Sequence, residues 1–140
     1  MIQAEQYLHE GATILAEVLK SEGFDFVLIA HGDSSGGRFA SGKFIRNNRE
    51  LEFHFRHSLG MVTYRLNGRD INHADYMQVV LGRSNASHYP GFSDDVLEGF
   101  RGLAQDLREH AQAFVTGTDE EFSRYIELAL TIPRRAGLPS

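Results

Sequence analysis

The segment LEFHFRH at residues 51–57 alternates apolar and polar side chains, and it decides the fold class. A period of two residues is typical of a β-strand with one buried face and one solvated face. The apolar side chains are Leu51, Phe53 and Phe55. The polar side chains between them are Glu52, His54 and Arg56. We therefore expect the aromatic side of this strand to face the core and the ionisable side to face water.

Three further segments have strand patterns, at residues 24–30, 38–46 and 61–66. The Gly- and Ser-rich stretch 31–37 predicts a flexible loop between the first two of them. Together with 51–57, these segments predict an antiparallel meander of three or four strands.

The rest of the chain has helical periodicity, in the segments 4–21, 72–82, 93–115 and 118–130. Asn72 and Ser93 precede two of these helices as expected N-caps, and Thr118 with Glu121 predicts a capping box. Gly23 is the expected stop of the first helix.

Segregated strands and helices indicate an α+β fold. We expect an N-terminal helix, a three- to four-stranded antiparallel meander, and three C-terminal helices packed on the aromatic face of the sheet. Residues 1–132 then form a single domain, and 133–140 a flexible C-terminal tail.

The composition limits the possible functions. The chain has 140 residues, a mass of 15.7 kDa and no Cys, which fits one domain and excludes a disulfide framework, a thiolate zinc site and a cysteine nucleophile. No apolar run is long enough for a membrane span, and the N-terminus lacks the pattern of a secretory signal. We therefore expect a cytoplasmic location and no membrane partner.

Charge is distributed unevenly along the chain. The formal net charge is −5, yet residues 31–69 hold seven Lys or Arg against three Asp or Glu. Residues 70–121 hold three Arg against ten acids. The basic block either pairs internally with the acidic helices or forms a docking surface of its own. The acidity of the whole chain makes nucleic acid an unlikely partner.

Two segments resemble catalytic motifs but depart from them. The stretch from Gly37 to Phe44 lacks the final Ser or Thr of a phosphate-binding loop and is expected to be a strand. Gly32-Asp33-Ser34 resembles the start of GDS-type esterases, but the Asp-x-x-His pair that ends at His73 lies in mid-sequence. The seven His residues show no metal-ligand spacing. We predict no catalytic residue, no metal site and no cofactor.

The runs SSGGRFASGKF, LEFHFRHSLGMVTYRLNG and YPGFSDDVLEGFRGLAQDL give the chain a resemblance that covers about residues 24–110. It resembles small bacterial α+β proteins without assigned chemistry. Its size, acidity and layout are also similar to those of immunity proteins that neutralise polymorphic toxins. The resemblance implies a protein-binding role and carries no individual functional residue.

The leading hypothesis is a protein-binding domain that neutralises a bacterial toxin by electrostatic docking. Its expected partner-binding residues are Glu52, His54, Arg56, Arg65, Arg38 and Arg46. One alternative is a small hydrolase or nuclease that uses His54 and Arg56, with His31 as a further candidate. Another is a homodimer joined through an uncovered sheet edge such as 38–46. Whether Arg65 shares the polar face depends on the strand register across residues 58–60.

Overall fold

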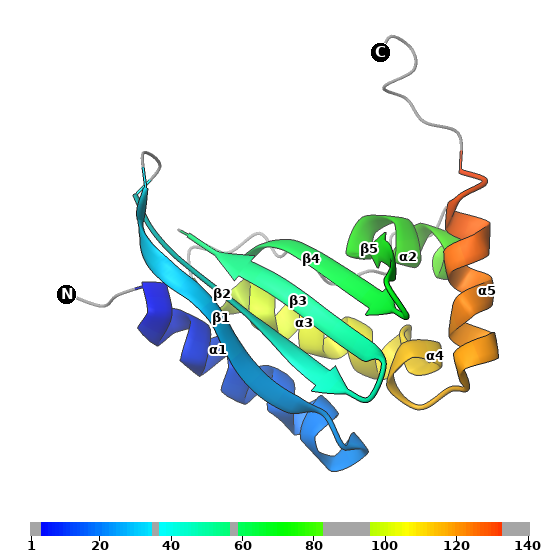
Figure 1. Cartoon of the computed structure of the whole chain (residues 1–140), viewed down its shortest axis with the longest axis horizontal. Helices are drawn as coiled ribbons and strands as arrows, with labels where there is room; N and C mark the ends of the chain where they lie inside the picture. The colour runs from blue at the N-terminus through cyan, green and yellow to red at the C-terminus, as the bar shows by residue number, and fades with distance from the viewer. Residues whose placement is uncertain (1–3, 35–36, 57–58, 83–95, 133–140) are drawn as a thin grey trace, which may run out of the picture.

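The structure, a computed structural model, describes residues 4–34, 37–56, 59–82 and 96–132. Its elements follow one another as a helix, a sheet and then a set of helices (Figure 1). They are α1 (Ala4–Leu19), η1 (Lys20–Glu22), β1 (Asp25–Ser34), β2 (Gly37–Arg46), β3 (Arg49–Phe55), β4 (Leu59–Leu66), β5 (Arg69–Asn72), α2 (His73–Leu81), α3 (Glu98–Glu109), α4 (Gln112–Val115) and α5 (Asp119–Ala129).

The five strands form one antiparallel sheet in the order β1-β2-β3-β4-β5. The α+β class and the antiparallel meander are therefore confirmed, with five strands rather than three or four. The additional strand is β5, which follows a turn at Asn67 and Gly68, both with positive φ. An Asn-Gly pair with two positive φ angles forms the hairpin turn that matches the twist of antiparallel strands.

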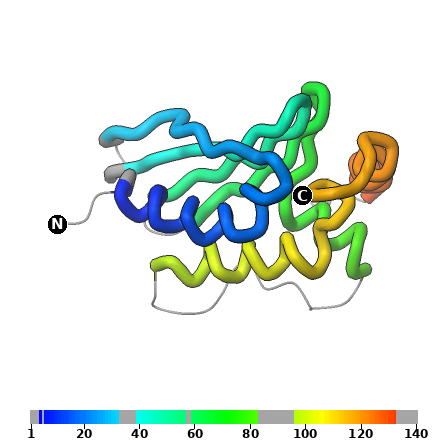
Figure 2. The backbone as a smooth tube through the Cα atoms, turned by 90° about the horizontal axis from the view of Figure 1, so that it is seen from below, coloured from blue at the N-terminus to red at the C-terminus, as the bar shows by residue number. Residues whose placement is uncertain are grey.

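Helices α1 and α3 lie side by side against one face of the sheet, which makes a two-layer structure (Figure 2). Phe100 of α3 contacts the rings of Phe53 and Phe55 with centroid distances of 6.0 and 5.9 Å. Tyr7 of α1 lies 5.6 Å from Phe55. The aromatic side of β3 thus faces the core as expected, but it is covered by the N-terminal helix as well as by α3.

Gly11 explains how closely α1 approaches α3. A Cβ atom at this position would lie 2.4 Å from a ring carbon of Phe100. A glycine inside a helix costs up to about 1 kcal/mol relative to alanine. Here the missing side chain allows the two helices to pack directly against each other.

A second group of aromatic rings joins β4 to the C-terminal helices. Tyr64, Tyr76, Phe114 and Phe122 are all buried, and Tyr64 lies 4.9 Å from both Tyr76 and Phe114. Each contact is edge-to-face, the geometry that the ring quadrupole favours. Figure 1 shows α2, α4 and α5 gathered at this end of the sheet.

Arg49 fixes the same end of the structure. Its side chain is 4% exposed, and its guanidinium donates hydrogen bonds to the carbonyl oxygens of Ala113, Phe114 and Gly117. It also forms an ion pair with Asp119, with an N···O distance of 3.0 Å. These carbonyl groups belong to the end of α4 and its connection to α5, where helical partners are missing.

Two predicted segments are wrong. Residues 31–34 and Gly37 are strand rather than loop, because β1 continues through Ser34, which pairs with Gly37 of β2, and residues 35–36 lie outside the described part. The predicted helix 93–115 is interrupted, because α3 ends at Glu109 and α4 begins at Gln112. Ser93 and the tail 133–140 lie outside the described residues.

The predicted caps of two helices and the predicted stop of the first helix are confirmed. Asn72 caps α2 by accepting a hydrogen bond from the Asp75 backbone at 2.7 Å, and Thr118 with Glu121 forms the predicted capping box. Gly23 adopts φ 92° directly after η1, as expected for a stop residue. In the described ranges, no helix is long and apolar enough to span a membrane.

Candidate protein-binding surface

The face of the sheet opposite α1 and α3 is covered by no described helix or strand (Figures 1 and 2). We call this the outer face. The strand register places Glu52 beside Thr63, and Glu50 beside Arg65, which in turn pairs with Asp70. Arg65 therefore lies on the same face as Glu52, which resolves the register that the sequence left open.

Charged side chains on the outer face form a network centred on Arg65. Its guanidinium lies 2.8 Å from a Glu52 oxygen, 3.5 Å from Glu50 and 4.0 Å from Asp70. Lys43 lies 3.3 Å from Glu50, and His54 lies 2.9 Å from Glu52. The network joins strands β2 to β5, so these side chains have fewer alternative rotamers than isolated surface charges.

Glu52 accepts hydrogen bonds from two directions in this network. The hydrogen bond from Arg65 is the main reason why the pKa of Glu52 is lowered, and the hydrogen bond from His54 contributes in the same direction. The carboxylate therefore stays ionised well below neutral pH. It holds Arg65 and His54 in place on the open face.

In the network around Arg65, the basic block of the sequence is balanced by acids. The carboxylates of Glu50, Glu52 and Asp70 outnumber the two network cations Lys43 and Arg65. Arg69 pairs with Glu127 of α5 at 2.6 Å. Together with the Arg49–Asp119 pair, this contact joins the basic block to the acidic helices, as one of the two sequence interpretations expected.

The other predicted site residues are dispersed. Arg56 follows β3, and its guanidinium lies 5.6 Å from the ring centroid of Phe39. Arg46 points away from the outer-face network, because it donates to the carbonyl oxygens of Glu22 and Val115, each at 2.9 Å. The Arg38 backbone pairs with Asp33 near the end of β2, and its side chain lies outside the described part. Glu52, His54 and Arg65 are the predicted residues that the structure brings together.

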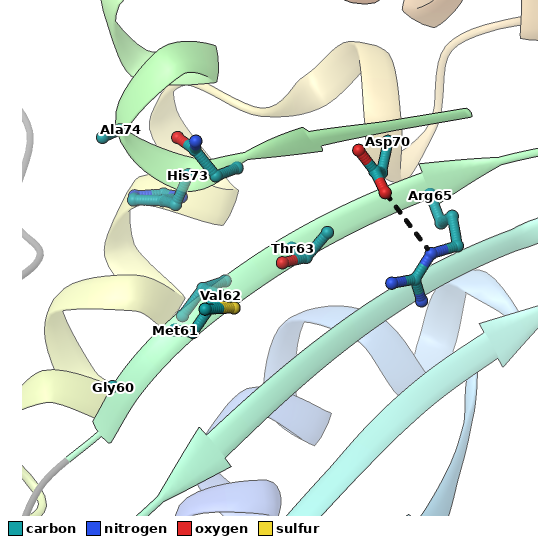
Figure 3. Close-up of a pocket in the computed structure, with 9 residues that line it drawn as sticks. Gly60, Met61, Val62, Thr63, Arg65, Asp70, His73 and Ala74 are labelled. Carbon is teal, nitrogen blue, oxygen red and sulfur yellow. Dashed lines mark ion pairs between the residues drawn. The ribbon is translucent and has the colours of Figure 1, made fainter. Parts of the chain in front are cut away.

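A cavity of about 680 Å³ opens where β5 gives way to α2 (Figure 3). Met61, Thr63 and Arg65 of β4 line one side, and Asp70 lines the other together with residues 72–74. Figure 3 shows the Arg65 and Asp70 side chains directed toward each other across this cavity. Met61 is 67% exposed at its rim, although a side chain of this size is usually buried.

His73 forms the floor of the cavity and belongs to a buried polar network. Its Nδ1 lies 2.7 Å from the Tyr64 hydroxyl, and its Nε2 lies 2.8 Å from Asp106. Burial raises the pKa of Tyr64 well above its usual value, so its hydroxyl keeps its proton. The Asp106 carboxylate accepts from Nε2–H, so both ring nitrogens of His73 have partners. The arrangement supports the wall of the cavity.

The sequence analysis missed Met61 and the buried network. A signal for Asp106 was present, because this carboxylate stands between Leu103 and Leu107 in the apolar stripe of α3. An ionisable residue at such a position indicates a buried partner. For Met61, the period-two pattern already places it outward, but no sequence feature shows that the face remains open.

In the part of the chain that the structure describes, no group of three or more His, Asp or Glu side chains could hold a metal ion. Comparison with known proteins gives no match to a family model, a curated protein or a solved structure.

Proposed function

We propose that this chain is a protein-binding domain and that the outer face over β3, β4 and β5 is its binding surface. The observation that carries the proposal is the exposed Met61 beside an ordered ion-pair network and a cavity. Protein interfaces commonly combine a large apolar anchor with a rim of polar groups. A face that only needed to be solvated would not require Met61.

The charges favour a partner that presents Lys or Arg side chains. In the network around Arg65, three carboxylates stand against the two cations Lys43 and Arg65, and the whole chain carries a formal charge of −5. Asp70 is mostly exposed, and its ion pair with Arg65 is the longest of the network at 4.0 Å. A partner cation at the cavity would complete the pairing of Asp70. Opposite charges would also accelerate the encounter.

Neutralisation of a bacterial toxin is one form that this binding would take. A toxin domain with a basic surface would satisfy the charge requirement stated above. This role is supported by the size, acidity and layout that the chain shares with immunity proteins, and by the open face.

The test compares arginine substitutions at two exposed apolar residues, Met61 and Leu128. Proteins captured from the native host by the wild-type chain are identified, and the affinity of each is measured by calorimetry. We expect Met61→Arg to weaken the specific partner at least about tenfold, since a truncated or charged anchor costs more than about 1.4 kcal/mol. Leu128→Arg, on α5, is the matched control and should bind normally, because Leu128 is also exposed but lies on another element.

Equal affinity of the wild type and Met61→Arg for every captured protein would contradict the proposed surface. The charge argument is tested separately by Asp70→Lys. This substitution should weaken the same complex, whereas stronger binding would show that the partner presents acidic groups.

A small hydrolase or nuclease is the second candidate. The observation in its favour is the His54–Glu52 contact at 2.9 Å, which supplies a carboxylate to orient the imidazole. Arg56 would then stabilise an anionic transition state. A screen against RNA, ADP-ribose derivatives and esters tests this candidate. Turnover that disappears in His54→Ala at an unchanged melting temperature would favour it over simple binding.

A further inference from the structure

The two edges of the sheet differ in how they are protected. Strand β5 has four residues, carries Arg69 and Asp70, and leads directly into α2. Strand β1 has ten residues, contains no Lys, Arg or Pro, and is uncharged from Phe26 to Ala30. Short length and charge are the usual means by which an edge strand avoids pairing with another chain. The β5 edge therefore has this protection, whereas the uncharged stretch of β1 is interrupted only by a bulge between Leu28 and Ala30.

The exposed side chains of β1 are also unusual. Val27 and Ile29 are 42% and 43% exposed. They are two of five large apolar side chains exposed in the described part of the chain. Because β2 pairs with β1 on one side and β3 on the other, residues 38–46 are internal to the sheet. The edge expected from the sequence is thus wrong, and β1 is the edge strand whose outer side pairs with no other described strand.

We propose that two copies of this chain pair through β1, antiparallel across a two-fold axis, and join their sheets. A two-fold axis at Leu28 places Val27 opposite Ile29 of the second copy, and Phe26 opposite Ala30 of the second copy. Every residue in this seam is uncharged. One surface that complements itself is what a two-fold dimer requires. The seam uses the backbone edge of β1, although the Val27 side chain lies on the outer face beside Lys43, with which it is paired.

The bulge in β1 lies inside this seam, because the register with β2 shifts between Leu28 and Ala30 and leaves Ile29 as the extra residue. Bulges locally disturb the regular spacing of an edge, so the pairing between the two copies is short. A short seam buries less area than a permanent dimer needs. We therefore expect a dimer that forms and dissociates with concentration.

The test follows the mass of the full chain by analytical ultracentrifugation from about 1 to 500 μM, the range in which a weak seam is half occupied. The average mass should rise from 15.7 kDa toward twice this value. Ile29→Lys should stay monomeric with unchanged circular dichroism and melting temperature. Met61→Lys is the matched control on the outer face, and it should still dimerise.

Cross-linking tests the register. The chain has no Cys, so a Val27→Cys chain and an Ile29→Cys chain can be mixed under mild oxidation. The mixed disulfide should form faster than either homodisulfide. A wild-type monomer at all concentrations, a dimer that persists in Ile29→Lys, or a dimer lost in Met61→Lys would each overturn the proposal.

Discussion

Replacing Arg49 with methionine is expected to remove about 3 kcal/mol or more from the free energy of unfolding. Methionine keeps most of the buried apolar stem, but it leaves the carbonyl oxygens of Ala113, Phe114 and Gly117 without their donor. Buried acceptors that lose their partner carry their full desolvation penalty. A small domain has about 5–15 kcal/mol of stability in total, so the loss is a large fraction.

Urea denaturation measures this effect as a lower midpoint with an unchanged slope. Arg69→Met is the matched control, because Arg69 makes a 2.6 Å ion pair with Glu127 at an exposed site. Exposed pairs contribute about 1 kcal/mol or less. Equal midpoints for the two variants would show that Arg49 is no more than a surface charge.

Asp106→Leu is expected to destabilise the protein by about 3 kcal/mol, because it leaves the Nε2–H group of His73 buried without an acceptor. Leucine has a similar size and is favoured in a helix, so packing and helix propensity change little. Asp106→Asn keeps an acceptor oxygen toward His73, and its loss should be smaller, at about 1 kcal/mol.

The two Asp106 variants are compared by urea denaturation, with hydrogen exchange in α2 and α3 as a second measurement. Amides around His73 should exchange faster in the Leu variant than in the wild type. In the Asn variant, their exchange rates should stay closer to those of the wild type. A Leu variant as stable as the wild type would show that the Tyr64–His73–Asp106 chain contributes nothing to the fold.

The strands that could be predicted are those in which local pattern and tertiary environment agree. In residues 51–57, alternation alone placed Phe53 inward and His54 outward, because one face of the sheet is buried and the other is not. The same argument placed Val62, Tyr64 and Leu66 inward on β4. Caps such as Asn72 were also predictable, since they depend on neighbours within three residues.

The errors arise where distant contacts override local composition. His31 to Gly37 has the composition of a loop, but pairing with a neighbouring strand keeps most of it extended. The sequence analysis ended the last strand at residue 66. The next two residues, Asn67-Gly68, are a strong hairpin signal, and Arg69–Asn72 forms one more strand. The interruption of the long helix near His110 has no signal in the sequence that we can identify.

The candidate surface was predictable only in part. Glu52 and His54 follow from alternation, but Arg65 needed the register across β3 and β4. Arg46 was a predicted site residue and Arg49 lies near the site in the sequence, but both donate to backbone carbonyl groups instead. Charge counts along a chain do not distinguish a displayed cation from one that is used internally.

The hydrogen bonds of Arg49 also bear on how the chain folds as it is synthesised. Its carbonyl acceptors follow it in the sequence by 64 to 68 residues. While the ribosome is still adding α4, β3 has been translated but the groups that satisfy its guanidinium have not emerged. The sheet therefore cannot reach its final stability during most of translation, and the apolar surface that the last two helices cover stays exposed until they are released.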